Sequence, residues 1–359
     1  MKPEALIYCE KEFGKVDGKV ANGLIRQSDT YKIVGVIDSS KTGEDSGECL
    51  DGVRNKIPIF KSLESALKEL ENSPKYFIYG IAPLTSFLNN EQKNIFFLAI
   101  KNKMNIVNGM PEFLNDNTQF RDMAHKYGVT IQDVRKPPDR KKLHNFTGRI
   151  QEIKTPIITV MGTDCAVGKR TSALLLVEAL KNEGLQAVFV TTGQTGLLQG
   201  SKYGVAIDVL TSGFATGEVE NAILNAYEKE NPDIIIVEGQ GALSHPAFTS
   251  SSAILRGSMP NAIIIQHPPK RKYYCDYPDI AMLTLGKEIE MIEVFSKSKV
   301  IAITINHEDM NDVEVNNAVI KYEAIHRLPT TDVLKYGCDK LIRILMKTFP
   351  ELKRDPKLV

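Results

Sequence analysis

The sequence has almost no net charge, because 45 lysine and arginine residues oppose 44 aspartate and glutamate residues in a chain of 359. Proteins that hold nucleic acid through its phosphates generally carry a positive field over one face or one domain. The near-neutral balance therefore argues against a nucleic-acid partner.

Closely spaced cysteines are also missing. The five cysteines are odd in number, form no CxxC pair and lie far apart, at Cys9, Cys49, Cys165, Cys275 and Cys338. Disulfide frameworks and zinc sites usually show cysteines in pairs or at short spacings. Neither is indicated here.

Long apolar runs are absent as well. The longest of them are far shorter than the roughly 18 residues that cross a bilayer. The first residues, Met1 to Ala5, lead directly into a strand-like run and not into the apolar core of a signal peptide. We expect a cytoplasmic protein without a membrane partner, and we expect it to form a homo-oligomer.

The sequence does contain an alternation of short β-rich runs with longer helical patterns, which is typical of parallel sheets built from βαβ units. The first series of predicted strands comprises Ala5–Cys9, Ile33–Ile37, Tyr76–Ile81 and Asn105–Asn108. The second comprises Ile157–Met161, Ala187–Thr191, Ile234–Val237, Ala262–Gln266 and Val300–Asn306. Helices are predicted near Lys19–Arg26, Leu63–Leu70, Gln92–Lys101, Thr171–Asn182, Gly217–Glu228 and Lys287–Lys297.

A charged segment with adjacent prolines, Pro137 and Pro138, separates the two series. Adjacent prolines resist helix and strand alike. We therefore predict domains over residues 1–134 and 151–359, joined by a linker over residues 135–150. The segment is interpreted as solvated, with the alternative that Arg135 or Lys136 folds onto the ligand and pairs with a phosphate or carboxylate, Arg135 being the predicted substrate contact.

The N-terminal series is Rossmann-like in its order, and Asp38 ends its second strand, where a dinucleotide-binding fold places a ribose-binding acid. The loop after the first strand, however, contains no G-x-G-x-x-G and carries several acidic residues. We therefore do not expect NAD, and Asp38 is interpreted as a strand-end acid or a helix cap.

A glycine-bounded loop from Gly162 to Thr171 follows the first strand of the second series and opens a helix. In that context backbone N–H groups converge on an anion, the helix start adds partial positive charge, and Lys169 reaches the terminal phosphates. The residues expected to bind a phosphate-bearing cofactor are Gly162, Thr163, Asp164, Gly168, Lys169, Arg170 and Thr171. The fold prediction is therefore α/β, with a Rossmann-like N-terminal domain followed by a P-loop NTPase-like parallel-sheet domain.

The loop departs from the commonest P-loop spacing. Five residues separate Gly162 from Gly168, and Arg170 stands where a serine or threonine normally binds magnesium. Thr171 comes one position later, about 100° further around the helix, and need not replace it. Magnesium is therefore possible, with Asp164 and Glu238 as its ligands if it is used.

Glu238, His245 and His267 lie just beyond predicted strand ends and are the candidate catalytic bases. The structural alternative for each histidine is a loop imidazole bonded to backbone. A carboxylate that ends an apolar strand is costly unless paired or used, which favours a role for Glu238.

Two further positions flank these candidates. The turn Thr192 to Gly196 suits close contact with a carboxylate or phosphoryl oxygen, so Gln194 and Thr195 are predicted to bind substrate, the alternative being a turn without a ligand. Cys165 lies inside the phosphate loop, where a small side chain usually serves packing and a nucleophilic role is the lesser alternative.

The pattern Gly-Thr-Asp-x-x-Val-Gly-Lys resembles dethiobiotin synthetase and related amidotransferase-like P-loop proteins. The run from Ile234 to Ala242, with Glu238-Gly239-Gln240-Gly241, is similar to a second segment of that group. This resemblance implies that Glu238 faces the metal and phosphates and that Asn306 recognises a base.

Over nearly the whole chain the sequence resembles a bacterial and archaeal family that joins a Rossmann-like domain to a P-loop domain and includes D-glutamate N-acetyltransferase. The resemblance rests on Gly162–Thr171, Thr192–Gly196, Asp208, Val237–Pro246, Gln266–Pro269, Gly23–Arg26 and Val36–Ser39. It implies N-acetylation of a small acidic amino acid by acetyl-CoA, whose phosphates the loop would hold without magnesium.

Two other functions stay open. One is an ATP- and magnesium-dependent ligase or carboxylase like dethiobiotin synthetase, and the other is a non-catalytic sensor of a nucleotide or metabolite. The strand-end Glu238 and the two proline-flanked histidines favour an enzyme over a sensor. Arg170 favours acetyl-CoA, whereas the pair Asp164 and Glu238 favours ATP with a metal.

Overall fold

A computed structural model describes residues 2–83 and 87–352. The chain divides into two compact units: Met1–Pro138 with Gln194–Gly200, and Asp139–Gly193 with Ser201–Val359. Each unit is built on a parallel β-sheet with helices on both faces, which confirms the predicted α/β class.

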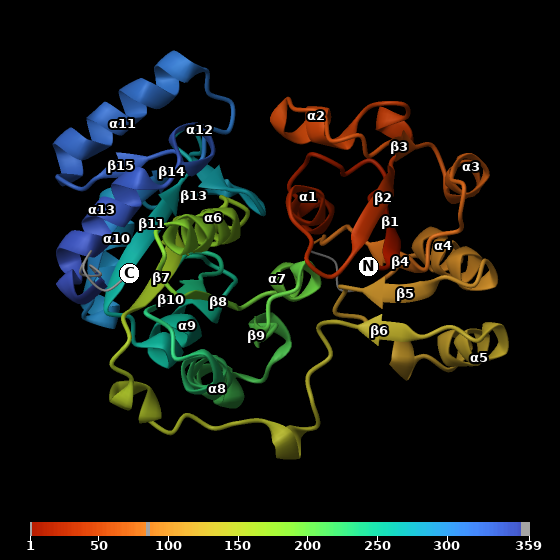
Figure 1. Ribbon diagram of the computed structural model, residues 1–359, viewed down its shortest axis with the longest axis horizontal. Coiled ribbons are helices and arrows are strands. Elements are labelled where there is room, and N and C mark those ends of the chain that lie inside the picture. Colours follow the sequence, from red (N-terminus) through yellow and green to blue (C-terminus); the bar gives the residue numbers. More distant parts are fainter. Residues whose placement is uncertain (1, 84–86, 353–359) are drawn as a thin grey trace. The chain divides into compact units, whose positions relative to one another are not determined.

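The sheet of the first unit has the strand order β3-β2-β1-β4-β5-β6, and every pairing in it is parallel. Its strands are β1 Glu4–Tyr8, β2 Lys32–Ile37, β3 Ile59–Phe60, β4 Tyr76–Tyr79, β5 Asn105–Asn108 and β6 Ile131–Asp133. Its helices are α1 Lys19–Arg26, α2 Ser46–Asp51, α3 Leu63–Glu69, α4 Asn90–Lys101, α5 Thr118–Tyr127 and α7 Gln194–Gln199. Helix α1 lies on one side of this sheet, and α4 and α5 lie on the other (Figure 1).

Helix α7 comes from the second half of the sequence but belongs to the first unit. The side-chain amide of Gln199 donates to the carbonyls of Gly23 and Gln27, over 2.8 and 3.1 Å, and Leu198 joins the buried core. The turn predicted over residues 192–196 is therefore wrong from Gln194 onward. The hydrogen bonds and apolar burial that hold this short helix are supplied by residues distant in sequence.

The seven-stranded sheet of the second unit has the order β15-β14-β11-β7-β10-β8-β9, again parallel throughout. Its strands are β7 Ile157–Gly162, β8 Ala187–Thr191, β9 Tyr203–Gly204, β10 Ile234–Glu238, β11 Ala262–His267, β14 Lys299–Ile305 and β15 Thr330–Thr331. Its helices are α6 Lys169–Asn182, α8 Ser212–Glu230, α9 Ser250–Ser258, α10 Leu285–Ser296, α11 Asp312–His326, α12 Val333–Tyr336 and α13 Asp339–Thr348. A separate antiparallel hairpin pairs β12 Tyr273–Tyr274 with β13 Tyr277–Ala281.

Alternate residues of the central strand β7 pack into cores on opposite faces of this sheet. Ile158 and Val160 pack with α6 and α13, whereas Ile157 packs with α8 and α9. Burial on both faces explains why β7, β10 and β11 are continuous apolar runs without a polar alternation. That pattern is what made the central strands recognisable in the sequence.

Every predicted strand occurs, with its ends displaced by at most two residues. The sequence did not predict the helices α5, α9, α11 and α13, nor several short strands, of which β3, β9, β12 and β15 have two residues each. A strand of two residues is too short to show a hydrophobic periodicity, so only the strand it pairs with defines it as a strand.

Asp38 is fully buried at the end of β2, where its carboxylate accepts hydrogen bonds from the backbone N–H groups of Phe13 and Ser40. It caps the short 3-10 helix Ser39–Lys41, which confirms the helix-cap interpretation. The carboxylate thus holds the loop after β1 against the end of β2.

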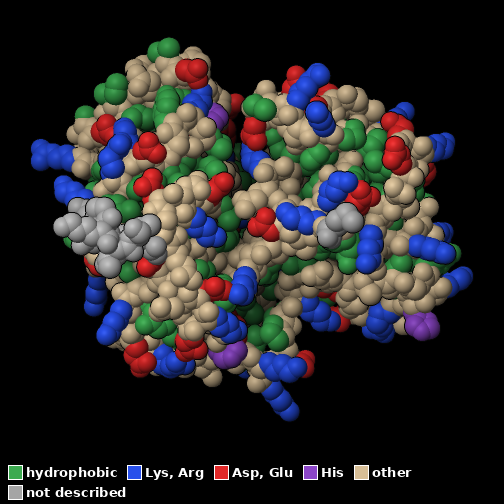
Figure 2. All heavy atoms as spheres, in the orientation of Figure 1, with side chains coloured by type: hydrophobic (Ala, Val, Ile, Leu, Met, Phe, Trp, Pro, Cys, Tyr) green, Lys and Arg blue, Asp and Glu red, His purple; other side chains and the backbone are tan. Residues whose placement is uncertain are grey.

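Charged side chains of both signs are interspersed over the face seen in Figure 2, as the near-zero net charge requires. Among the described residues, no helix combines the length and the apolar character needed to cross a bilayer.

Candidate functional site

The phosphate loop connects β7 to α6 and turns through two left-handed residues, Ala166 at a φ of 50° and Gly168 at a φ of 101°. Helix α6 begins at Lys169, whose buried ammonium donates to the carbonyl oxygen of Asp164 over 2.6 Å. Burial lowers the pKa of Lys169, and nearby anionic groups, Asp164 and Glu238 among them, oppose that shift. The loop thus presents a helix N-terminus and a buried cation together, the two elements that bind polyphosphate.

The neighbouring strands hold this loop in place. Thr163 N–H donates to the carbonyl of Gln266 over 3.1 Å, and the Gln266 side chain accepts from the hydroxyl of Ser172. The Asn306 amide donates to the carbonyl of Val167 over 3.0 Å. Asn306 therefore lies against the loop, while its role in recognising a base stays a prediction.

Arg170 and Thr171 occupy the first turn of α6 and are both half-buried. No serine or threonine occupies the position that ordinarily contacts magnesium, because Arg170 stands there. Their roles in cofactor binding stay predictions.

Asp164 is fully buried, and both of its carboxylate oxygens already accept hydrogen bonds. Oδ1 accepts from Cys165 N–H over 2.7 Å, and Oδ2 accepts from Arg271 Nη1 and Cys275 N–H, each over 2.8 Å. Burial alone would lower the pKa of Arg271, but its pairs with Glu308 and Asp164 raise it. A metal that bound Oδ2 of Asp164 would therefore have to displace a permanently charged guanidinium.

Glu238 ends β10 and is buried beside the loop. Its Oε2 accepts from the hydroxyl of Thr191 and from the N–H of Thr192, the latter over 3.2 Å. The Glu238 carboxylate is close enough to Lys169 for its negative charge to oppose the lowering of the Lys169 pKa by burial. The structure therefore brings Glu238 to the phosphate loop, as expected for a base or a metal ligand.

His267 is buried with both ring nitrogens engaged. Nδ1 is 2.9 Å from the hydroxyl of Thr163, and Nε2 is 3.1 Å from the hydroxyl of Tyr322. Burial, followed by the charges of His326 and Arg271, lowers the pKa of His267 to about 4. A role as a base would require it to release one of its two partners, so this geometry favours His267 as a support for the loop.

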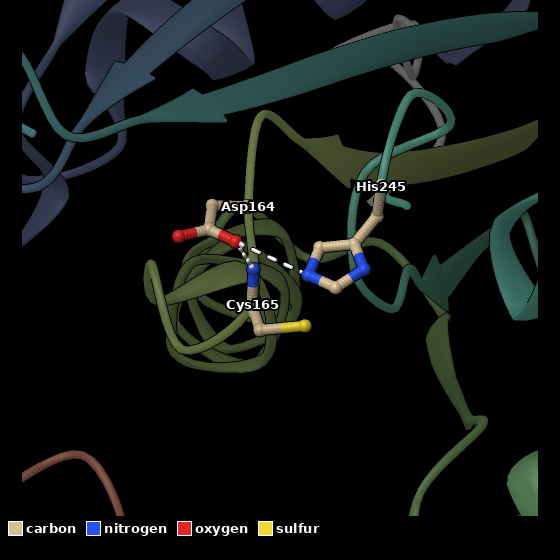
Figure 3. A group of neighbouring side chains, drawn as sticks. All are labelled: Asp164, Cys165 and His245. Atoms are coloured by element: carbon tan, nitrogen blue, oxygen red, sulfur yellow. Dashed lines mark hydrogen bonds and ion pairs between the residues drawn. The ribbon is translucent and has the colours of Figure 1, made fainter. Parts of the chain in front are cut away.

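His245 differs, because one of its nitrogens is left without a partner. Nδ1 accepts from the backbone N–H groups of Ala247 and Phe248, over 3.2 and 3.3 Å. Nε2 has no hydrogen-bond partner among the described residues, and it lies 3.8 Å from Oδ1 of Asp164. Figure 3 shows the sulfur of Cys165 beside this imidazole ring, and the three side chains bring their polar atoms within 4.8 Å of one another.

Aromatic side chains and a buried acid fix the position of His245. Its ring stacks on Phe248 at 4.6 Å between centroids and meets the edge of Tyr274 at 4.8 Å. Glu288 is fully buried below this segment and accepts from the N–H of Leu243, over 2.7 Å, and from the hydroxyl of Ser244. Burial raises the pKa of Glu288, and the hydrogen bonds that position the segment oppose that shift.

Cys275 lies against the phosphate loop, and its thiol donates to the backbone carbonyl oxygen of Cys165 over 3.7 Å. The contact with Cys275 lowers the pKa of Cys165, burial opposes that shift, and the neighbouring His245 and Lys169 add to it. The same contact raises the pKa of Cys275. The negative charge therefore belongs on Cys165, which is half-buried.

The predicted substrate-binding residues lie in the first unit. Gln194 and Thr195 are buried on α7. Arg135 donates from Nη1 to the carbonyl of Gly109 over 3.5 Å, and burial lowers its pKa to about 10. Gln194 Cγ would lie 3.7 Å from a Cβ placed on Gly109, so Gln194 and Arg135 both lie near the end of β5. Their roles toward substrate stay predictions.

Sequence reasoning missed the hairpin that brings Arg271, Tyr274 and Cys275 onto the loop. Arg271 also donates to the carbonyl of Cys165 over 2.8 Å, and the Tyr274 hydroxyl is 2.8 Å from that of Ser244. The tyrosine-rich stretch from Tyr273 to Tyr277 was the one available signal, and it carries no spacing that points to a partner.

Two family models match the sequence. The first is a Rossmann-like domain, DUF1611_N, over residues 39–137, and the second is a P-loop domain described as a domain of unknown function, DUF1611_C, over residues 144–342. A curated protein named D-glutamate N-acetyltransferase from Pseudoalteromonas sp is 31% identical over 275 residues, covering 75% of this chain and 80% of the relative. A protein of the same name from Tritonibacter scottomollicae is 25% identical over 277 residues, covering 76% and 81%.

Among solved structures, the crystal structure of a DUF1611 family protein from Anabaena variabilis superposes with a TM-score of 0.89 at 29% identity. The match covers 96% of this chain and all of that one. The same pair of domains, in the same order, thus occurs in an experimental structure.

Proposed function

We propose, since this chain belongs to the two-domain DUF1611 family, that it transfers an acetyl group from acetyl-CoA to the amino group of a small acidic amino acid of the D-glutamate class. The observation that carries the proposal is the 31% identity, over three quarters of the chain, to a protein named D-glutamate N-acetyltransferase. Both curated relatives carry that name.

The phosphate loop supports a donor that bears phosphates. CoA carries a pyrophosphate and a 3′-phosphate, which the N-terminus of α6 and the buried ammonium of Lys169 are suited to bind. Binding CoA requires no magnesium, which agrees with Arg170 at the usual metal-contacting position and with the Arg271 guanidinium on Asp164. Lys169 and the loop N–H groups would anchor the donor while its thioester reacts nearby.

The acceptor amine must lose a proton before or during its attack on the acyl carbon. Glu238 supplies a buried carboxylate beside the loop, held by Thr191 and Thr192. These hydrogen bonds fix the orientation of the carboxylate. Glu238 is therefore the proton acceptor in this proposal.

The direct test is an acetyl-transfer assay. The full-length protein is incubated with acetyl-CoA and D-glutamate, and the release of CoA thiol and the mass of the N-acetylated product are followed in parallel. L-glutamate, D-aspartate and D-lysine serve as comparison acceptors. We expect an acidic acceptor to be preferred, and the absence of turnover with every acidic amino acid would reject the proposed function.

A ligase or carboxylase that uses ATP and magnesium is the second candidate. It is favoured by one observation, which is that the carboxylates of Asp164 and Glu238 both lie close enough to Lys169 to oppose the lowering of its pKa by burial. Two acids beside a phosphate-binding lysine suit a divalent cation bound to nucleotide. This candidate predicts hydrolysis of ATP that depends on an amino-acid or amine substrate and stops on chelation of magnesium.

A further inference from the structure

We propose that Cys165 is a nucleophile, which accepts the acyl group from a thioester donor as an enzyme-bound thioester and then passes it to the acceptor amine. This inference rests on the proposed acyl transfer and adds a covalent step to it. It concerns a residue to which the sequence gave mainly a packing role.

The position of Cys165 is the first argument. It lies between Asp164 and Ala166 in the phosphate loop, and its side chain is half-buried, so it remains reachable. A donor held through its phosphates by this loop would be bound next to the thiol. Nucleophile and donor would thereby be brought together by the same segment.

The unpartnered nitrogen of His245 is the second argument. The His245 side chain is fully buried, its Nε2 makes no hydrogen bond with any described residue, and that atom faces Asp164 and Cys165 (Figure 3). Leaving a buried polar atom unsatisfied is unfavourable by about 1–3 kcal/mol. Such an orphan is expected where a group is reserved for a charge or for a reacting ligand.

The tautomer of His245 follows from its other nitrogen. Nδ1 accepts from two backbone N–H groups, so the proton of the neutral ring must be on Nε2. The ring therefore directs an N–H toward the cluster and can stabilise a thiolate on Cys165. Lys169 is the nearby cation, and the Cys275 thiol donates to the backbone carbonyl oxygen of Cys165 over 3.7 Å.

The arrangement favours charge on one cysteine of the pair. Cys165 has the cation Lys169 and the imidazole of His245 as neighbours, whereas the charges of Asp164 and Asp276 oppose a thiolate at Cys275. Arg271 neutralises Asp164 and holds the carbonyl of Cys165, which fixes the backbone under the sulfur. Cys275 and Arg271 are thus positioning residues for Cys165.

The chemistry balances with the donor and acceptor already proposed. The Cys165 thiolate attacks the acyl carbon, a carbon–sulfur bond to Cys165 forms, and the bond to the donor sulfur breaks, so CoA leaves as a thiolate that takes a proton from solvent. The acceptor amine, having lost a proton to Glu238, then attacks the enzyme thioester. An amide forms and its excess proton passes to solvent. Cys165 is released as a thiolate, and Glu238 returns its own proton to solvent.

The experiment traps the intermediate without an acceptor. The full-length protein is mixed with acetyl-CoA or, as a second acyl donor independent of the phosphate site, with p-nitrophenyl acetate, and then quenched in acid and digested. Peptide mass spectrometry locates any acetyl group. We expect a burst of about one leaving group per chain and acetylation of Cys165, which disappears when D-glutamate is added before the quench.

Variants separate the covalent route from its alternatives. Cys165→Ser keeps the size of the side chain and should abolish both the burst and turnover. His245→Gln should slow the burst by about 100-fold or more. Cys49→Ala, which alters a cysteine outside the site, should change neither, and thermal unfolding checks that each variant folds.

Each outcome decides the proposal. Turnover by wild type without acetyl-Cys165, together with turnover by Cys165→Ser, would overturn the covalent route and leave the proposed function standing. Acetyl-Cys165 without turnover of any acidic amino acid would support the nucleophile and reject the acceptor. The proposal also fails if neither donor acylates Cys165.

Discussion

Arg271 donates from Nη1 to Oδ2 of Asp164 over 2.8 Å, an ion pair in which both side chains are almost entirely buried. This pair ties the segment that leads into the tyrosine-rich hairpin to the phosphate loop, because the same guanidinium nitrogen also binds the carbonyl of Cys165. Breaking one member of a buried pair leaves an uncompensated charge. The structure of the loop therefore depends on a residue more than a hundred positions away.

Replacing Lys169 with methionine should abolish most of the stabilisation that a phosphate-bearing ligand gives. The ammonium is the buried cation at the start of α6, and losing a charged hydrogen-bond donor lowers affinity by about 10–100-fold. Thermal shift and calorimetry with acetyl-CoA and with ATP measure this. Lys181→Met, an exposed change in the last turn of the same helix, is the control, and equal affinity in K169M and wild type would contradict the prediction.

Replacing Glu238 with glutamine should lower turnover by roughly 100-fold, since a positioned proton acceptor or a metal contact is lost while shape is preserved. Steady-state kinetics on the acidic amino acid provide the measurement. Glu228→Gln, at the exposed end of α8, is the matched control. Full activity of E238Q would show that Glu238 has a structural role through Thr191 and Thr192.

Chelation of magnesium should leave turnover unchanged. Arg271 occupies Oδ2 of Asp164, and Arg170 replaces the usual metal-contacting hydroxyl, so the acyl-transfer reaction is expected to proceed in excess EDTA. The rate is compared with and without the chelator, and again after magnesium is restored. Loss of turnover that magnesium rescues would favour the ATP-dependent ligase.

Acid should destabilise the protein partly through His267. Its pKa is lowered from 6.5 to about 4 in the folded protein, so as the pH falls from about 6.5 to about 4 the unfolded chain takes up a proton that the folded chain does not. The free energy of unfolding therefore decreases across that window. Denaturant unfolding of His267→Gln should show a shallower slope there, and His125→Gln, on the exposed face of α5, should keep the wild-type slope.

Glu288 should change the free energy of unfolding with pH in the opposite direction. Burial raises its pKa in the folded state, so the folded chain holds the proton more tightly, and wild type gains stability relative to Glu288→Gln as the pH falls through the ordinary range of a glutamate. Unfolding of both proteins across that pH range measures the difference. Glu290→Gln, exposed on the same helix α10, should not reproduce it. A constant difference between wild type and E288Q would contradict the prediction.

The sequence by itself determined the α/β class, the central strands and the phosphate loop. Strands buried on both faces, such as Ile157–Gly162 and Ile234–Glu238, must be continuous apolar runs, and a loop that binds phosphate must combine glycines with Lys169 at a helix start. These requirements are local, so residues that are adjacent in the sequence satisfy them. For Asp38 the sequence left a strand-end acid and a helix cap open, and the structure shows the cap.

Only the tertiary structure decided which side chains share the site. Cys165, His245 and the pair Arg271 and Cys275 come from three separate segments. No spacing in the sequence states that Cys165 and His245 lie side by side or that Arg271 binds Asp164. Helix α7 likewise exists because Gln199 and Leu198 find partners in a unit formed by the first part of the chain. Hydrogen bonding and burial depend on which segments the fold brings together, and the packing of the whole sheet determines which segments those are.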